Sequence, residues 1–279
     1  MNKIPPIDAP HTIRLIEDFI RTRVTESGTK GVIIGLSGGI DSAVVASIAV
    51  RALKPKNVLT FFLPSATTPS SDIGDVKSLC SQLGVKLTEI NIQKLIDRFS
   101  EEVQEKEDSS ILRWANFKPR IRQAIFYFYA NRFNYLVCGA GNKSEIMIGY
   151  FTKFGDGAVD ILPIGDVYKT HVMQLGKYLN IPDCILTKAP SAGLWEGQTD
   201  EAEIGMSYLQ LDNILYGLER FQTEVEVADY LQIPITEVKR VRSMLYQSEH
   251  KRRGPLIFKL GIRTPNIDWR IPLVKPSDV

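Results

Sequence analysis

The sequence is poor in cysteine and histidine and has no long hydrophobic segment. It contains three cysteines and three histidines in 279 residues. Cys80, Cys138 and Cys184 are far apart and form no C-x-x-C pair, which predicts reduced thiols and argues against a disulfide framework or a zinc site. No apolar run reaches the ~18 residues that a membrane span needs, and no apolar signal segment follows Met1. These absences predict a cytoplasmic protein without a membrane partner.

The sequence also lacks a strong excess of charge of either sign. Its formal net charge is +2, which gives no general electrostatic reason to expect a nucleic-acid partner. Hydrophobic residues make up 44% and charged residues 24%, the proportions of an ordinary globular protein. The length allows one large α/β domain with a hydrophobic core, with or without an appendage.

One stretch, Gly31 to Val50, combines three local patterns. Val32 to Leu36 is apolar and β-branched, which predicts a buried strand. Ser37 to Ser42 is a polar turn that contains a pair of glycines. Ala43 to Val50 is apolar and rich in alanine, which predicts a buried helix. Together these segments form the first half of a βαβ unit.

Such a turn directs backbone N–H groups and a helix N-terminus at one point, which suits a phosphate. Gly38 and Gly39 allow close approach of a ligand, and Ser37 and Ser42 add hydroxyl groups. Asp41 would repel phosphate unless a cation lay between them, so the pattern also calls for Mg²⁺. The simpler alternative is an ordinary turn in which Asp41 or Ser42 is an N-cap. The six residues together favour phosphate binding, although the pattern is neither a Walker loop nor a dinucleotide fingerprint.

Strand and helix patterns alternate up to about residue 180, which predicts a doubly wound parallel sheet with helices on both faces. We expect a single domain over 1–279, with an α/β core at 11–180, a mainly helical part at 181–255 and a tail at 256–279. Further strands are predicted at 57–63, 86–92, 135–139 and 161–164. Helices are predicted at 11–25, 71–84, 95–103, 116–131, 167–179, 201–220, 225–231 and 235–248.

A second glycine loop, Gly139 to Glu145, follows the predicted fourth strand. Ligands of open parallel sheets lie beyond the strand ends where the strand order reverses. If the first and fourth strands are neighbours there, Asp41 and Glu145 face one place and could hold Mg²⁺ with substrate phosphates. Asn142 to Glu145 also has the pattern of a capping box, in which Glu145 would only bond back to Asn142. The pattern alone does not separate these alternatives.

Several basic residues have both a functional and an ordinary interpretation. Arg120, Arg122, Lys153 and Lys169 could neutralise a polyphosphate, but each could also be a solvated surface charge. The basic cluster His250 to Arg253 could equally be a favourable helix C-terminus.

The segment Val227 to Arg242 resembles a helix-turn-helix, so a DNA-binding protein is a rival hypothesis from another class. The near-neutral net charge weighs against it.

Ser37 to Ser42 resembles the pyrophosphate loop of the N-type ATP pyrophosphatases, which split ATP between its α- and β-phosphates. Further segments are similar to the motif series of the NAD synthetase family. They are Lys118–Arg122, Gly139–Glu145, Phe151–Gly157, Gly197–Gly205 and His250–Arg252. The resemblance runs from about residue 11 to residue 255 in the order found in the family, and 256–279 carries no recognised motif.

The resemblance implies an adenine nucleotide alpha hydrolase-like fold and a ligase that converts deamido-NAD to NAD with ATP and ammonia. An adenylated intermediate forms, and pyrophosphate and AMP leave. No catalytic side chain is expected, because the attacking carboxylate is already ionised; the site has to align and neutralise anions.

The resemblance also implies specific contacts. The ATP contacts are Gly35, Leu36, Ser37, Gly38, Gly39, Ile40, Asp41, Ser42, Ala140, Lys169 and Ser191. The deamido-NAD contacts are Arg120, Lys153, Asp160, His250 and Lys251, and the Mg²⁺ ligands are Asp41 and Glu145.

Two residues depart from the family pattern. Ala140 stands where some members have threonine, so a contact there must come from the backbone. Pro119 stands where alanine is usual, which predicts a shifted helix start before Arg120.

Free ammonia is the expected nitrogen donor, because the chain has no room for a glutaminase domain; a separate glutaminase subunit that delivers ammonia is the open alternative. The family is typically homodimeric, and the aromatic band Phe126 to Tyr129 could serve the dimer interface or the core. Pyrophosphatases that modify tRNA or amidate purines, and a non-catalytic nucleotide binder, are the remaining alternatives.

Overall fold

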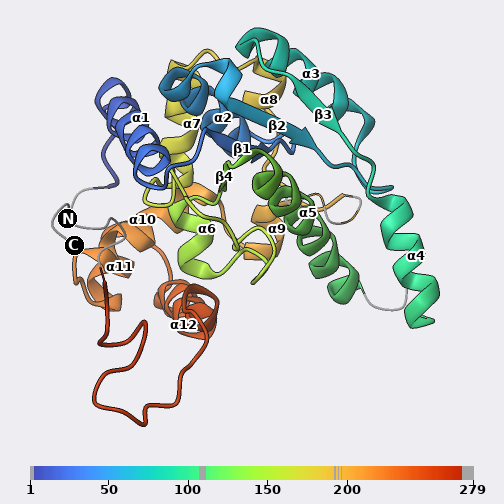
Figure 1. Ribbon diagram of the computed structural model, residues 1–279. Coiled ribbons are helices and arrows are strands. Elements are labelled where there is room, and N and C mark those ends of the chain that lie inside the picture. Colours follow the sequence, from blue (N-terminus) through green and yellow to red (C-terminus); the bar gives the residue numbers. More distant parts are fainter. Residues whose placement is uncertain (1–2, 107–110, 192, 194, 196, 272–279) are drawn as a thin grey trace, which may run out of the picture.

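The computed structural model describes residues 3–106, 111–191, 193, 195 and 197–271. Its sheet is parallel, with the strand order β3-β2-β1-β4 (Figure 1). The strands are β1 Val32–Gly35, β2 Val58–Phe62, β3 Leu87–Glu89 and β4 Leu136–Cys138. The chain proceeds outward from β1 to β3 and then crosses to the free side of β1, so the strand order reverses between β1 and β4. The expected pairing of the first and fourth strands is confirmed.

Helices surround the sheet. Those that precede β4 are α1 Ala9–Glu26, α2 Ile40–Leu53, the 3₁₀ turn η1 Pro55–Asn57, α3 Ser70–Leu83, α4 Gln93–Val103 and α5 Ile111–Phe133. Those that follow it are α6 Lys143–Ile148, α7 Lys169–Tyr178, α8 Asp183–Leu186, α9 Asp200–Ile204, α10 Tyr208–Glu219, α11 Glu224–Leu231 and α12 Ile235–Arg252.

Successive side chains of the strands point to opposite faces, and each face has its own hydrophobic cluster. Ile33, Phe61 and Val137 pack with residues of α4 and α5. Their neighbours Ile34 and Phe62 pack on the other face, in a cluster that includes residues of α1, α2, α3 and α7. Both faces are therefore covered by helices, as the apolar strand sequences predict, and the doubly wound fold is confirmed.

The aromatic band of α5 is divided between core and surface. Phe126 and Tyr129 both contact Phe61, with ring centroids 6.1 and 4.9 Å apart. Phe128 points away and is 65% exposed. The core interpretation therefore holds for Phe126 and Tyr129, and a role of the band in a dimer interface stays a prediction.

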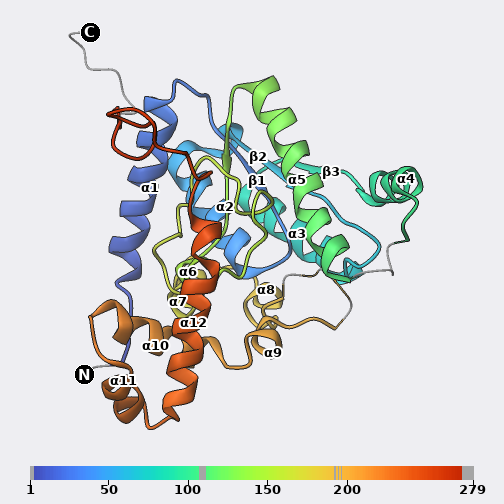
Figure 2. The same cartoon turned by 90° about the horizontal axis from the view of Figure 1, so that it is seen from below.

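Helices α10, α11 and α12 gather at one end of the molecule (Figure 2). Their cluster includes Leu211, Ile214 and Val241, and it also includes Ile148 and Tyr168 from the preceding α/β part. The helical part is thus joined to the sheet region by shared apolar packing. Within the described residues, no helix is both long and apolar enough to cross a membrane.

Three expected elements differ from the structure. Residues 161–164 form no strand, since only Ile161 makes a bridge, to Cys138. The helix expected at 201–220 is interrupted at Gly205, which has a φ of +76° and ends α9. Helix α5 begins at Ile111 and continues through Pro119, so the expected helix start before Arg120 is wrong. Burial of Trp114 and Ala115 in the core stabilises the extra turns and outweighs the low helix propensity of proline.

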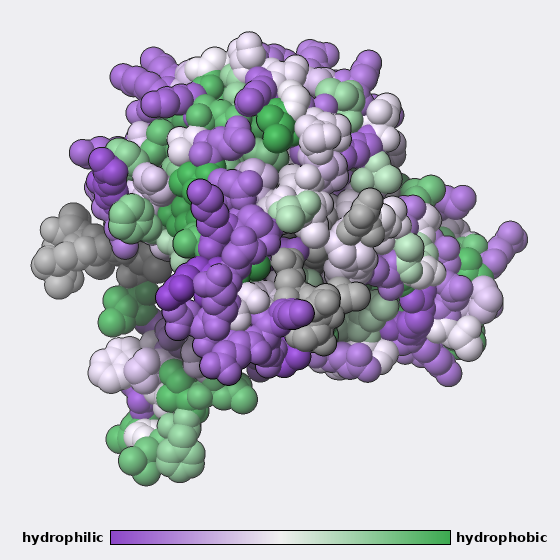
Figure 3. Space-filling view, turned by 90° about the vertical axis from the view of Figure 1, so that its right-hand side faces the viewer, coloured by the Kyte–Doolittle hydropathy of each residue, from purple (hydrophilic) through white to green (hydrophobic). Residues whose placement is uncertain are grey.

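Residues 254–271 follow α12 and project from the body (Figure 1). Leu256, Phe258, Leu260 and Ile262 are each more than four-fifths exposed, and this projection is visibly hydrophobic in Figure 3. Its ion pair, Lys259 with Asp268, lies within the projection itself. Part of the expected tail, 272–279, lies outside the described residues.

Candidate active site

The loop after β1 is held by its own hydroxyl groups. The Ser37 N–H donates to Ser42 Oγ at 3.2 Å, and the Gly39 N–H donates to Ser37 Oγ at 3.2 Å. Helix α2 begins after the N-cap Gly39, which supplies no side-chain hydrogen bond. The alternative in which Asp41 or Ser42 is the N-cap is therefore wrong, and the first turn of α2 keeps backbone N–H groups for an anion.

Gly38 brings this loop against α3. Its φ is +81°, and a Cβ atom there would lie 3.1 Å from Cβ of Asp72. Asp72 is buried and forms an ion pair with Lys188, which also lies 3.8 Å from Asp75. The loop conformation thus depends on glycine for both its backbone angle and its contact with a carboxylate.

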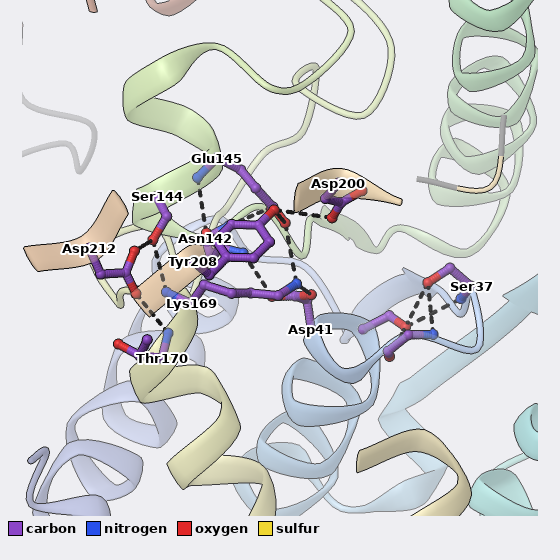
Figure 4. A network of polar contacts seen from close by, with 12 residues as sticks. Ser37, Asp41, Asn142, Ser144, Glu145, Lys169, Thr170, Asp200, Tyr208 and Asp212 are labelled. Carbon is purple, nitrogen blue, oxygen red and sulfur yellow. Dashed lines mark hydrogen bonds and ion pairs between the residues drawn. The ribbon is translucent and has the colours of Figure 1, made fainter. Parts of the chain in front are cut away.

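The second glycine loop lies at the end of the neighbouring strand β4. Asn142 caps α6 and forms a complete capping box with Glu145. The Asn142 side chain also donates to Asp41 Oδ1 at 2.8 Å, which links the two loops (Figure 4). The capping interpretation of Glu145 is therefore correct, but it does not exclude the other role, because Oε1 of the same carboxylate faces Lys169.

Lys169, the first residue of α7, lies between the two carboxylates (Figure 4). Its ammonium group forms an ion pair with Asp41 and lies 3.4 Å from Glu145 Oε1. Tyr208 completes this group by donating to Asp200 Oδ2 at 3.1 Å and to Glu145 Oε1 at 3.5 Å. Four distant segments therefore contribute to one charged cluster.

Burial and charge act against each other in this cluster. Burial, opposed by Lys169 and reinforced by Asp41 and Asp200, raises the pKa of Glu145 to about 8. Burial also raises the pKa of Asp200. Burial alone would lower the pKa of Lys169, but Asp41 and Glu145 outweigh it, so this pKa lies above its ordinary value. The lysine is thus held as a cation among carboxylates that repel one another.

Four of the five residues expected to contact deamido-NAD lie around the segment 149–157. Lys153 Nζ donates to the His250 carbonyl at 2.6 Å, and Arg120 donates to the Lys153 carbonyl. Lys251 Nζ donates to the carbonyls of Gly149 and Phe151. The structure thus brings these four together around 149–157.

The fifth residue, Asp160, lies beside β4. It accepts from the Val137 N–H at 2.7 Å and from the Tyr127 hydroxyl at 3.1 Å. Arg122, another candidate cation, donates to the Leu63 carbonyl, and burial lowers its pKa to about 10.

Two of the expected ATP contacts, Ala140 and Ser191, contribute few polar groups to the site in this structure. Ser191 is exposed, and its hydroxyl accepts from the Gly193 N–H at 3.1 Å. Ala140 packs against the core, so any polar contact there comes from its backbone. Ser191 is nevertheless on a segment fixed near the site, because Lys188 pairs with Asp72 and the Pro190 carbonyl accepts from the Asp200 N–H.

Four members of the site could not be predicted from the sequence: Asp72, Lys188, Asp200 and Tyr208. Asp200 lies within the Gly197–Gly205 motif, which was a signal without an assigned role. The others carry no local pattern, since their partners are far away in the sequence.

Several arginines of the helix-turn-helix segment and of the basic cluster that follows it have internal partners. Arg252 donates to the carbonyls of Ile146 and Met147 at the end of α6. Arg240 donates to the carbonyls of Ile204 and Gly205, and Arg242 pairs with Glu224. These contacts weigh against the DNA-binding hypothesis, because the cations stabilise the fold instead of forming a free basic surface.

Comparisons with known proteins show which family the chain belongs to. The ammonia-dependent NAD⁺ synthetase of Sulfolobus acidocaldarius is 44% identical over 271 residues, which cover 96% of this chain and 94% of that protein. That of Methanosarcina acetivorans is 44% identical over 248 residues, 88% of this chain and 96% of that protein.

Solved structures give the same result. The NMN synthetase of Francisella tularensis has a TM-score of 0.81 and 35% identity, covering 91% of this chain and all of that one. The ammonia-dependent NAD synthetase of Campylobacter jejuni, solved with nitrate, has a TM-score of 0.77 and 31% identity, with the same coverage. The family described as NAD synthase matches residues 12–255, and this chain belongs to that family.

Proposed function

We propose that this protein is an ammonia-dependent NAD synthetase, which amidates deamido-NAD with ATP and releases AMP and pyrophosphate. Family membership supports the reaction class. The observation that carries the proposal is the meeting of the two glycine loops, where Asp41 and Glu145 share the Lys169 ammonium group. This is an arrangement for holding a nucleotide triphosphate at the reversal point of the sheet.

In the first step, a carboxylate oxygen of deamido-NAD attacks the α-phosphorus of ATP. The bond between the α-phosphorus and its bridging oxygen to the β-phosphate breaks, and pyrophosphate leaves with the electron pair. We assign phosphate binding to the loop Gly35–Ser42, with further ATP contacts from Ala140, Lys169 and Ser191. Their task is to align two anions and to reduce the repulsion between them.

In the second step, the nitrogen of ammonia attacks the activated carbonyl carbon. The bond from that carbon to the AMP oxygen breaks, AMP leaves, and the nitrogen loses a proton to give the amide. We assign the orientation of the dinucleotide to Arg120, Lys153, Asp160, His250 and Lys251. The chain needs no nucleophile of its own for either step.

Mg²⁺ fits the donor set at this site. Lys169 faces three acidic side chains, Asp41, Glu145 and Asp200, and carboxylate oxygens are ligands that Mg²⁺ accepts beside substrate phosphates. Within the described part of the chain, no group of three or more acidic, histidine or cysteine side chains could hold a metal by itself. Asp41 and Glu145 would therefore share the ion with phosphate oxygens, and the ion would supply charge neutralisation.

A mononucleotide is the second candidate substrate, because a structure named as an NMN synthetase matches this chain with a TM-score of 0.81. The same chemistry would then act on the carboxylate of nicotinate mononucleotide. The two substrates differ in the adenylate half of deamido-NAD, so comparing kcat/KM for both decides between them.

The test is a turnover assay with purified protein, ATP, Mg²⁺, ammonium and either substrate, followed for the amide product, AMP and pyrophosphate. We expect stoichiometric amide and AMP from deamido-NAD, and no turnover when glutamine replaces ammonium. ATP binding without pyrophosphate release would instead indicate a non-catalytic nucleotide binder.

The proposal extends to assembly and location. A homodimer would cover exposed apolar residues such as Phe128 on α5. Sedimentation of wild type and Phe128→Asp tests this, and a wild-type monomer would contradict it. A reducing cytoplasmic location agrees with the free thiols of Cys80, Cys138 and Cys184.

A further inference from the structure

Asp212 is a carboxylate with no exposed surface, located on α10 in the helical part of the chain. Both of its oxygens accept hydrogen bonds. Ser144 Oγ donates to Oδ1, and the Thr170 N–H donates to Oδ2 at 2.8 Å (Figure 4). A fully buried carboxylate is costly unless such donors satisfy it, so its partners show what it stabilises.

Those partners lie at the start of α7. The N-cap of this helix, Tyr168, supplies no side-chain hydrogen bond. Instead, the Lys169 N–H donates to Ser144 Oγ at 2.9 Å, and the Thr170 N–H donates to Asp212. Two of the N–H groups that a helix start leaves unpaired are therefore capped by residues from other elements.

The same hydrogen bonds fix α6. Ser144 donates to Asp212 and accepts from Lys169, so it lies between the two. The next residue along α6 is Glu145, and the first residue of α7 is Lys169. One buried carboxylate thus sets the relative placement of the two helix starts whose side chains meet in the charged cluster.

We propose that Asp212 is a positioning residue for the reaction, which acts through the Asp212–Ser144–Lys169 contacts to hold the Lys169 ammonium group and the Glu145 carboxylate in register. This inference rests on the proposed function. Asp212 itself does not face the ligand; its effect on catalysis passes through Lys169. A displacement of about 1 Å in a positioning group can lower a rate by about 10²-fold.

The test compares Asp212→Asn with wild type and with the control Asp229→Asn, an exposed aspartate on α11. Asparagine presents one acceptor and one NH₂ group, so it can satisfy only one of the two donors. We expect kcat for AMP release to fall about tenfold or more in Asp212→Asn and to stay at the wild-type value in Asp229→Asn. Ser144→Ala removes only the hydroxyl group that lies between Asp212 and Lys169, and it should lower kcat by a smaller factor.

A double-mutant cycle separates positioning from general destabilisation. Affinity for Mg·ATP is measured for wild type, Asp212→Asn, Lys169→Met and the double variant. If Asp212 acts through Lys169, its substitution weakens binding in the wild-type background and changes it less than about twofold in the Lys169→Met background. Equal losses in both backgrounds, or unchanged kcat and affinity in Asp212→Asn, would overturn the proposal.

If the proposed function itself is wrong, the same experiments give a different pattern of results. In that case the wild type itself forms no amide, while the cycle on Mg·ATP affinity still reports whether Asp212 acts through Lys169. If Asp212→Asn does not fold, Ser144→Ala takes its place in the cycle.

Discussion

Two helix starts meet in this site, and they are built in different ways. The start of α2 is arranged by its own loop, in which Ser37 and Ser42 are five residues apart. The start of α7 is arranged from a distance, since Ser144 is 25 residues from Lys169 and Asp212 is 42 residues from Thr170. The first arrangement follows from local sequence, whereas the second exists only after the chain has folded.

The difference has a functional consequence. At α2 the first backbone N–H groups have no side-chain cap, which suits an anionic ligand. At α7 the corresponding N–H groups are occupied by protein, and the side chain of Lys169 faces the site instead. Helix α2 presents backbone N–H groups to the site, whereas α7 presents the Lys169 side chain. Substitutions at the two helix starts should therefore have different effects.

The largest effect is expected at the α2 start. Asp41→Ala removes a proposed metal ligand and the partner of Lys169, so AMP release should fall by at least about 10²-fold. The fold should persist, because Asp41 lies outside the apolar core. Turnover and circular dichroism check both points, and Asp18→Ala at an exposed position of α1 is the control. Turnover at the wild-type rate in Asp41→Ala would contradict the proposal that Asp41 is a metal ligand.

Gly38 tests whether the loop depends on local geometry. Gly38→Ala combines a φ of +81° with a methyl group 3.1 Å from Asp72, so we expect a loss of about 1–3 kcal/mol in stability and weaker ATP binding. Gly28→Ala is the matched control, because its φ is +67° but no atom lies within 4 Å of the added methyl group. Chemical denaturation and ATP titration give both quantities. Equal losses of ATP affinity in both variants would show that the contact with Asp72 is irrelevant.

Glu145 allows a test by pH in the absence of Mg²⁺ and nucleotide. Its folded-state pKa of about 8 lies above that of an unfolded glutamate, so the folded chain holds the proton longer. The contribution of Glu145 to stability is therefore greatest at low pH and is lost as the pH rises to about 8. Glu145→Gln keeps a capping-box residue without this titration.

Relative to wild type, the free energy of unfolding of Glu145→Gln should rise between pH 5 and about pH 8 and then level off. Urea unfolding at several pH values measures this difference. A constant difference across that range would contradict the raised pKa.

The smallest effect is expected at Lys188. Lys188→Met leaves the buried Asp72 without its cation and loosens the segment that carries Ser191. KM for ATP should rise about threefold to tenfold with little change in kcat, because binding is affected more than chemistry. Lys77→Met, an exposed residue of α3 that lies 3.8 Å from Glu89, is the control. A fall in kcat at unchanged KM would indicate a direct role in the reaction instead.

Much of the fold could be predicted because its signals are local. The alternating strands and the glycine turn at 37–42 identified the sheet and the end of it at which we propose that ATP binds. The strand expected at 161–164 failed because a short apolar run does not show whether a neighbouring strand is available. Proline at 119 was misinterpreted because burial of the surrounding helix outweighs a local propensity.

The residues of the candidate site also differ in whether local sequence patterns could predict them. Asp41 and Glu145 could be named from glycine loops, and their proximity followed from the reversal of strand order. Asp72, Lys188 and Asp212 could not be named, since each contacts the site through long-range partners and belongs to no contiguous pattern.

The sequence by itself determined the alternation of strands and helices, the two glycine loops and the family to which the chain belongs. Those features depend on the periodicity of side chains and on backbone freedom over a few neighbouring residues. The tertiary structure alone decided that Lys169 lies between two carboxylates and that α10 caps the start of α7. Such contacts join residues far apart in the chain, and these residues meet only when the chain has folded around its buried hydrophobic clusters.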